Sequence, residues 1–140
     1  DIMLESVLGK DHGKLSMCKT KDSTFEHNMY VEVIYAFDTR SINKIALSPL
    51  SLPIYKKIVV NNKGIVVNDF SLKNNLTQNV FQQEAENIFQ KIKPNLSSFL
   101  QEAQKEIDKW LAYEKNKSID DFLDGLNMKI DALRFVIVDR

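Results

Sequence analysis

The sequence is poor in the residues that mark several classes of protein. It has one cysteine, Cys18, so the chain cannot form an internal disulfide, and a lone thiol fits a reducing compartment. No apolar run approaches the roughly 20 residues that a membrane-spanning helix needs. The 19 basic and 19 acidic residues cancel, whereas a nucleic-acid-binding chain normally carries a basic excess. We therefore expect no membrane and no nucleic-acid partner.

Recognisable patterns for metal binding and catalysis are also missing. The soft metal ligands are His12, Cys18 and His27, and their spacing matches no zinc pattern. Cys18 falls in an alternating, strand-like stretch, where a half-buried structural thiol is more common than a nucleophile assisted by histidine. We therefore predict no catalytic residue, no metal and no cofactor, and a chain that is not an enzyme.

What the sequence does contain is a hydrophobic pattern whose period changes near residue 71. Residues 29–37 alternate, with apolar side chains at the odd positions and Glu32 on the other face, which predicts a strand. Two β-branched runs, at 54–60 and 65–67, surround Gly64 and predict a hairpin. Before them, Pro49 and Pro53 bound an extended stretch, and residues 2–8 have the spacing of a short N-terminal helix that stops at Gly9.

The second half has helical spacing. One apolar stripe covers residues 76–92 and another covers 96–111, with Pro94 between them. Because proline normally ends or kinks a helix, the pattern predicts two long helices that each bury one face. Ser118 is a candidate cap for a third, shorter helix, and residues 132–138 predict a closing strand.

Together these elements predict an α+β fold. We expect an antiparallel β-meander with an N-terminal helix, two long C-terminal helices on one face, and a C-terminal helix/strand extension. Residues 1–117 would form the domain, and residues 118–140 the extension that packs on it. Because the chain begins at Asp1 rather than Met, we expect it to be cut from a longer protein.

Three short strings of this sequence are similar to those of a known family. Met3–Asp11 (MLESVLGKD) matches a helix of the type A-L-x-S-I-Y-x-x-D, Ser48–Pro53 keeps both prolines of Y-P-x-x-x-P, and Lys63–Ile65 matches K-G-L. Over about residues 2–115 the chain resembles the RWD domain, a non-catalytic relative of the ubiquitin-conjugating-enzyme fold. Two departures are Ser48 in place of the family's tyrosine, and a strand-like stretch at 65–70 where the family enters a helix.

The resemblance implies a binding platform, as found in translation-control kinases, ubiquitin ligases and kinetochore subunits. It also implies no thioester chemistry, because Cys18 lies in the first strand, whereas a conjugating enzyme has its cysteine after the last core strand. We predict a non-catalytic protein–protein interaction module, a regulatory or scaffold domain of a larger intracellular protein, cytoplasmic or nuclear. The alternative is a fragment of an enzyme whose catalytic residues lie outside this chain.

The predicted partner is another protein, and dimerisation with a second copy or another chain is compatible with the sequence. With balanced charge, binding should depend on a few aromatic anchors. The end of the second long stripe offers Trp110 and Tyr113 beside Lys115 and Lys117. The competing interpretation is that Trp110 packs in the core and that the third helix covers Tyr113.

Overall fold

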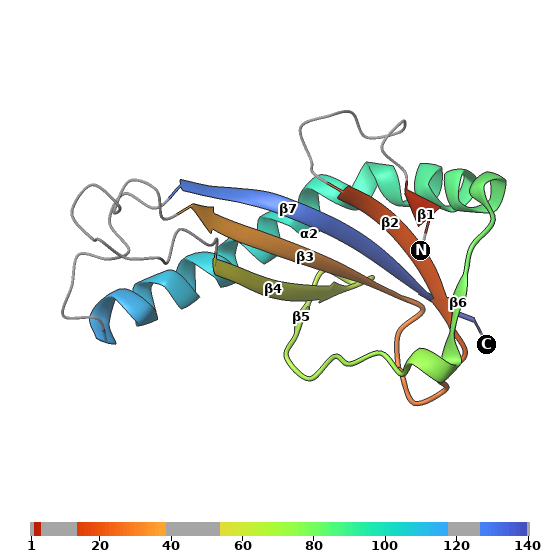
Figure 1. Cartoon of the computed structure of the whole chain (residues 1–140), viewed down its shortest axis with the longest axis horizontal. Coiled ribbons are helices and arrows are strands. Elements are labelled where there is room, and N and C mark those ends of the chain that lie inside the picture. The colour runs from red at the N-terminus through yellow and green to blue at the C-terminus, as the bar shows by residue number, and fades with distance from the viewer. Residues whose placement is uncertain (1, 4–13, 39–53, 118–126, 140) are drawn as a thin grey trace.

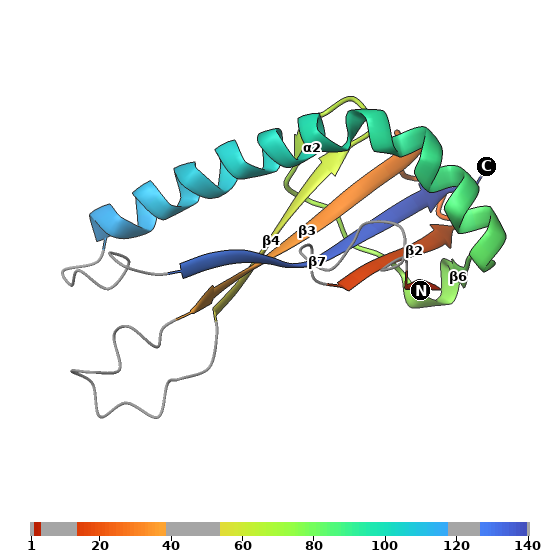
Figure 2. The same ribbon diagram turned by 90° about the horizontal axis from the view of Figure 1, so that it is seen from above.

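The computed structural model describes residues 2–3, 14–38, 54–117 and 127–139. These residues form one mixed β-sheet with a long helix across one of its faces (Figures 1 and 2). The elements in chain order are β1 (Ile2–Met3), β2 (Lys14–Thr20), β3 (Met29–Asp38), β4 (Ile54–Asn61), β5 (Val66–Val67), the 3-10 turn η2 (Asn74–Leu76), β6 (Thr77–Asn79), the helix α2 (Gln82–Lys117) and β7 (Asn127–Val138).

The strand order shows that the predicted antiparallel meander is wrong. The order across the sheet is β1-β2-β7-β3-β4-β5, and β6 also pairs with β2. β7 lies between β2 and β3, parallel to β2 and antiparallel to β3, whereas the other pairs are antiparallel. β2 and β3 are consecutive in sequence and run in opposite directions, and β7 lies between them. A strand in that position must be parallel to one neighbour and antiparallel to the other, so the sheet is mixed.

The strand at residues 29–38 and the hairpin after it are confirmed. The odd positions of β3 from Met29 to Phe37 are buried in the core, and β4 pairs with β5 around a turn in which Gly64 has φ of 81°. Asn61 holds this turn, because its Oδ1 accepts the N–H groups of Lys63 at 2.8 Å and Ile65 at 3.1 Å. Glycine suits the positive φ because it has no Cβ.

The prediction of two long helices is wrong, because α2 is one helix of 36 residues with Pro94 inside it. Proline lacks the N–H that would bond the Gln90 carbonyl, yet its exposed position puts that defect on the solvent side. The apolar stripe continues in phase on both sides of it, at spacings of three and four, through Phe89, Ile92, Leu96, Phe99 and Ala103, all buried. Figure 2 shows α2 bending over the sheet, the expected effect of an internal proline.

The predicted N-terminal helix is also not observed. Ile2 and Met3 form β1, opposite Met17 and Ser16 of β2, and the rest of that prediction lies outside the described residues. The proline-bounded stretch at 49–53 and the third helix after Ser118 lie outside them as well. The predicted closing strand at 132–138 is observed as part of β7, which begins earlier, at Asn127.

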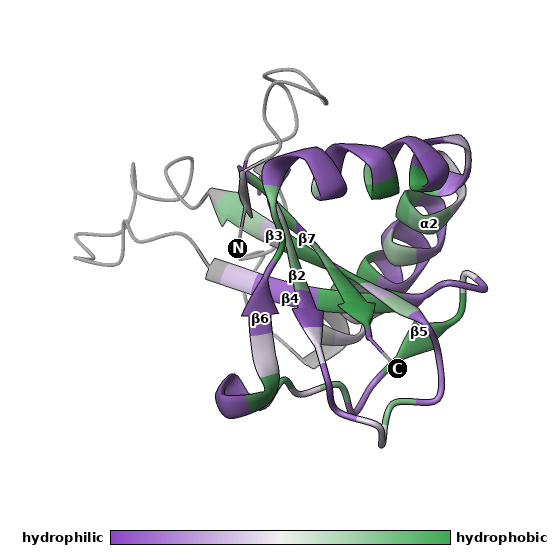
Figure 3. Cartoon of the chain, turned by 90° about the vertical axis from the view of Figure 1, so that its right-hand side faces the viewer, coloured by the Kyte–Doolittle hydropathy of each residue, from purple (hydrophilic) through white to green (hydrophobic). Residues whose placement is uncertain are grey.

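A buried apolar cluster lies on each face of the sheet. The larger cluster lies between α2 and the sheet, and Figure 3 shows the apolar residues concentrated in the strands while much of α2 is hydrophilic. A smaller cluster on the opposite face contains Cys18, Tyr30, Val59, Phe70, Val136 and Val138. Tyr30 and Phe70 pack there with ring centroids 4.7 Å apart. Of the described helical residues, no stretch has both the length and the apolar character needed to cross a bilayer.

Candidate functional site

The edge strand β4 extends well beyond its partner β5. β5 pairs only with Val59 and Val60, although β4 begins at Ile54. In an antiparallel ladder, the N–H and C=O of alternate residues point to the same side. The Asn61 N–H bonds the Ile65 carbonyl at 2.9 Å. The backbone N–H and C=O groups of the odd-numbered residues of β4 therefore point toward β5, and those of the even-numbered residues point toward β3. Lys57 and Tyr55 therefore direct their backbone groups outward, and within the described chain no strand pairs with them.

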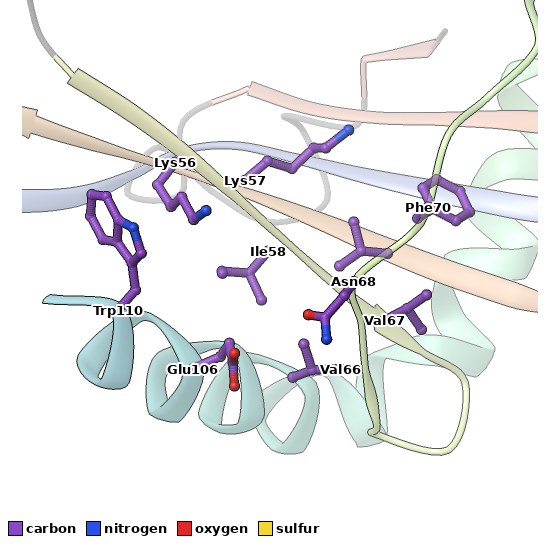
Figure 4. Close-up of a pocket in the computed structure, with 10 residues that line it drawn as sticks. Lys56, Lys57, Ile58, Val66, Val67, Asn68, Phe70, Glu106 and Trp110 are labelled. Carbon is purple, nitrogen blue, oxygen red and sulfur yellow. The ribbon is translucent and has the colours of Figure 1, made fainter. Parts of the chain in front are cut away.

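A cavity of about 160 Å³ lies at this edge, between β4, β5 and α2. Figure 4 shows Trp110 and Glu106 rising from α2 toward β4, with Val66 of β5 at the other end of the space. The lining combines apolar and charged side chains: Lys56, Lys57, Ile58, Val59, Val66, Val67, Asn68, Phe70, Glu106 and Trp110. Six of these ten residues are apolar or aromatic and four are polar or charged, so the cavity can contact groups of both kinds.

Trp110 forms one wall of this cavity and is neither core nor fully exposed. Its ring packs against Phe37 of β3, with centroids 5.6 Å apart, and its burial is intermediate. Lys56 Nζ lies 5.3 Å from the centroid of the ring, within the range of a cation–π interaction. A tryptophan held in this way presents a fixed apolar surface to the cavity.

The other predicted partner-binding residues lie further along the same helix. Tyr113 is one turn beyond Trp110 and is 57% exposed. Lys115 and Lys117 fall in the last turns of α2, and their side chains lie outside what the structure describes. Trp110 and Tyr113 therefore lie at the same end of α2, and Trp110 lines the cavity.

Charge at the site is divided between the two faces of β4. Lys56 lies on the side of α2, whereas Lys57 lies on the opposite side and bonds the Glu32 carboxylate, with Nζ 3.1 Å from Oε2. Arg134 also bonds this carboxylate. Glu106 is the acidic residue of the cavity lining. The β4 edge thus has two consecutive lysines, one on each face of the sheet, along a backbone that no other strand in the described ranges pairs.

Cys18 has the surroundings of a structural thiol. It is fully buried in the smaller apolar cluster, and this burial raises the pKa of the thiol above its usual value. A higher pKa lowers the fraction of the nucleophilic thiolate at neutral pH. Across the residues that the structure describes, His, Cys, Asp and Glu side chains form no group of three or more that could hold a metal ion.

Sequence reasoning did not single out Lys56 or the β4 edge. A signal was present, because the two arms of the predicted hairpin are unequal, with seven residues at 54–60 and three at 65–67. Unequal arms leave the longer strand overhanging unless a third strand covers it. Glu32 was also missed as a buried group, because it was assigned to a face expected to be polar.

No family model matches the chain, and no curated protein does either. The RWD resemblance therefore depends on its three short strings. Most of Met3–Asp11 and all of Ser48–Pro53 lie outside the described residues. Lys63–Ile65 lies in the turn between β4 and β5.

Proposed function

We propose that this chain is a non-catalytic protein–protein interaction module within a larger intracellular protein. Its partner docks where α2 passes the edge of β4. The observation that carries the proposal is the position of Trp110, which is half-buried against Phe37 and forms a wall of a cavity. The cavity lies beside a strand edge that no other described strand pairs. Tryptophan and tyrosine are over-represented among the residues that dominate binding energy at interfaces.

The surroundings of Trp110 support this assignment over simple core packing. A core tryptophan at this site would be covered on all sides, whereas Trp110 keeps one side toward the cavity and Tyr113 remains 57% exposed. The side chain of Lys56 is held over the ring. A pre-ordered aromatic side chain loses little conformational entropy on binding, which favours affinity.

The test is affinity capture with the wild-type chain, Tyr113→Ala and the matched control Phe81→Ala. Phe81 is 83% exposed just before the opposite end of α2, so it controls for the loss of any exposed aromatic residue. We expect Tyr113→Ala to reduce the recovery of a specific partner about tenfold, which corresponds to about 1.4 kcal/mol. Phe81→Ala should recover it normally, and both variants should melt within a degree or two of wild type.

Two results would count against the proposal. One is equal loss of the captured protein in Tyr113→Ala and Phe81→Ala, which would indicate non-specific adhesion to exposed aromatic rings. The other is a capture that survives both Tyr113→Ala and a double variant that adds Trp110→Phe. A partner of that kind would bind elsewhere on the molecule.

A further inference from the structure

We propose that the partner binds by adding a β-strand to the edge of β4, and that this strand is extended and acidic. This inference rests on the proposed function and specifies how the partner would bind. In strand addition, main-chain hydrogen bonds supply affinity and pockets for alternate side chains supply specificity. The β4 edge offers both features.

Among the described residues, no strand pairs with the backbone of β4 where the new strand would lie. The backbone groups of the odd-numbered residues of β4 point away from β3. Tyr55 and Lys57 therefore offer two N–H donors and two C=O acceptors on the same edge on which Val59 pairs with β5. β5 ends at Val67, and the chain leaves the ladder at Asn68. The incoming strand would therefore continue the sheet from the point at which β5 stops.

The cavity lies at the same point and can take a side chain from such a strand. It is bounded by Val66 at one end and by Trp110 at the other (Figure 4). A single water needs only about 10–15 Å³ of such a space, so 160 Å³ can receive a larger apolar group. Side chains of a strand alternate between two faces, so every second residue of the partner would point toward α2.

The charge on the edge favours acidic residues in the partner. Lys56 and Lys57 are consecutive, so one lies on each side of the edge, and opposite charges across a strand pair are stabilising. Lys57 already bonds Glu32, which leaves Lys56 above Trp110 as the principal site for a carboxylate. Glu106 on α2 disfavours a carboxylate deeper in the cavity, which places it near the strand.

The same two lysines argue against a second copy of this chain as the occupant. Two β4 edges paired antiparallel around their middle would bring lysine opposite lysine, and like charges directly opposite are destabilising. Lysines on an edge strand commonly prevent this kind of self-association. An acidic strand from a different protein has no such conflict.

The experiment uses Trp110 as its probe, because it is the one tryptophan in the chain. Its fluorescence is titrated with three capped eight-residue peptides that carry threonine at every second position, so that the other face of the strand alternates valine with glutamate, with serine or with lysine. We expect a saturable change with the glutamate peptide, weaker binding by at least tenfold with the serine peptide, and no binding of the lysine peptide.

Backbone pairing is tested by comparing Tyr55→Pro with Tyr55→Ala. Proline removes the outward N–H and is tolerated on an edge strand, whereas alanine retains it. We expect Tyr55→Pro to weaken the glutamate peptide at least tenfold and Tyr55→Ala to weaken it less than threefold. If Tyr55→Pro melts well below Tyr55→Ala, hydrogen exchange in the wild-type chain replaces that comparison. We then expect the peptide to protect the Tyr55 and Lys57 amides from exchange.

The role of charge is tested with Lys56→Glu and a matched control, Lys91→Glu, on the exposed part of α2. Lys56→Glu should transfer the preference from the glutamate to the lysine peptide, and Lys91→Glu should leave it unchanged. Equal affinity for all three peptides would overturn the acidic specificity.

Unchanged binding in Tyr55→Pro, or no new amide protection in wild type, would overturn strand addition. In that case the proposed function would still stand if Tyr113→Ala loses its captured partner, because that result tests the docking site and not strand addition. Wild-type self-association in sedimentation that Tyr55→Pro abolishes would instead identify a second copy as the occupant.

Discussion

Arg134 on β7 donates a hydrogen bond from Nε to Oε1 of Glu32, the residue directly opposite it on β3. Lys57 on β4 bonds the other carboxylate oxygen. The Glu32 side chain is 1% exposed, whereas those of Arg134 and Lys57 are 33% and 44% exposed. One buried anion is therefore held between two cations that reach solvent, and it links three adjacent strands.

Because the two cations differ in burial, we expect their removal to lower the free energy of unfolding by different amounts. Arg134→Met leaves the buried carboxylate with its more exposed partner alone, and we expect it to lower the free energy of unfolding by about 3 kcal/mol. Lys57→Met removes a partly solvated pair and should cost about 1 kcal/mol or less. Urea denaturation of both variants measures the difference, with Lys91→Met as the surface control. Equal losses would show that burial of Glu32 does not decide the cost.

Tyr35 gives a second prediction, because its hydroxyl is buried and finds no hydrogen-bond partner among the described residues. Replacing a hydroxyl that has no partner with hydrogen removes a desolvation cost. We expect Tyr35→Phe to raise the free energy of unfolding by about 1 kcal/mol at neutral pH in urea denaturation. A loss of that size would mean that the hydroxyl has a partner in solution.

The same residue predicts a change in stability at alkaline pH. Burial, together with the negative charge of Asp108, raises the pKa of Tyr35 from 10.0 to about 12. Between these two values the unfolded chain loses the proton while the folded chain retains it, so stability falls as the pH rises. The difference in stability between Tyr35→Phe and wild type should therefore widen from pH 10 to pH 12. A difference that stays constant over this range would contradict the prediction.

Cys18 should be unreactive and functionally dispensable. Its thiol is buried and its pKa is raised, so a thiol-specific reagent should modify it slowly in the folded chain and rapidly in denaturant. Cys18→Ser should leave partner capture unchanged and cost about 1 kcal/mol of stability, because it buries a hydroxyl. Rapid modification of the folded chain, or loss of capture by a folded Cys18→Ser protein, would restore the nucleophile hypothesis.

Replacement of Pro94 by alanine should stabilise α2. Pro94→Ala restores the N–H that bonds the Gln90 carbonyl, and a proline in a helix interior costs about 3 kcal/mol relative to alanine. We expect a higher melting temperature, with a gain smaller than that full cost because the native core has adapted to the bend. A destabilised Pro94→Ala variant would show that the buried contacts of Ile92 and Leu96 require the bend.

Local patterns in the sequence predicted part of the local structure, although the N-terminal helix and the division of the long helix were wrong. Alternation identified β3, and the turn around Gly64 identified the hairpin, because both are set by neighbours in the chain. The predicted division of the helix at Pro94 was wrong, and the sequence contained a sign of this. A proline that ends a helix usually lets the next stripe begin at a new angle, whereas Ile92, Leu96 and Phe99 keep one phase through it.

The order of the strands could not be read from the sequence in this way. Nothing local in residues 132–138 indicates that they lie between β2 and β3, because pairing depends on residues far away in the chain. The burial of Glu32 had a partial signal: Tyr30, Ile34 and Ala36, on its face of β3, are apolar or aromatic, which is typical of a strand covered on both sides. The cavity at the β4 edge needed α2 to be placed in space.

The central position of β7 has a consequence for the synthesis of this protein. β7 pairs with both β2 and β3, and it is the last of the described strands to leave the ribosome. Until then the two halves of the sheet have no strand between them, and the apolar strands β2 and β3 each expose an unpaired edge. Such edges are aggregation-prone while contacts distant in sequence are awaited. The nascent chain therefore cannot complete its sheet before residues 127–138 have emerged, and its protection by chaperones matters most in that interval.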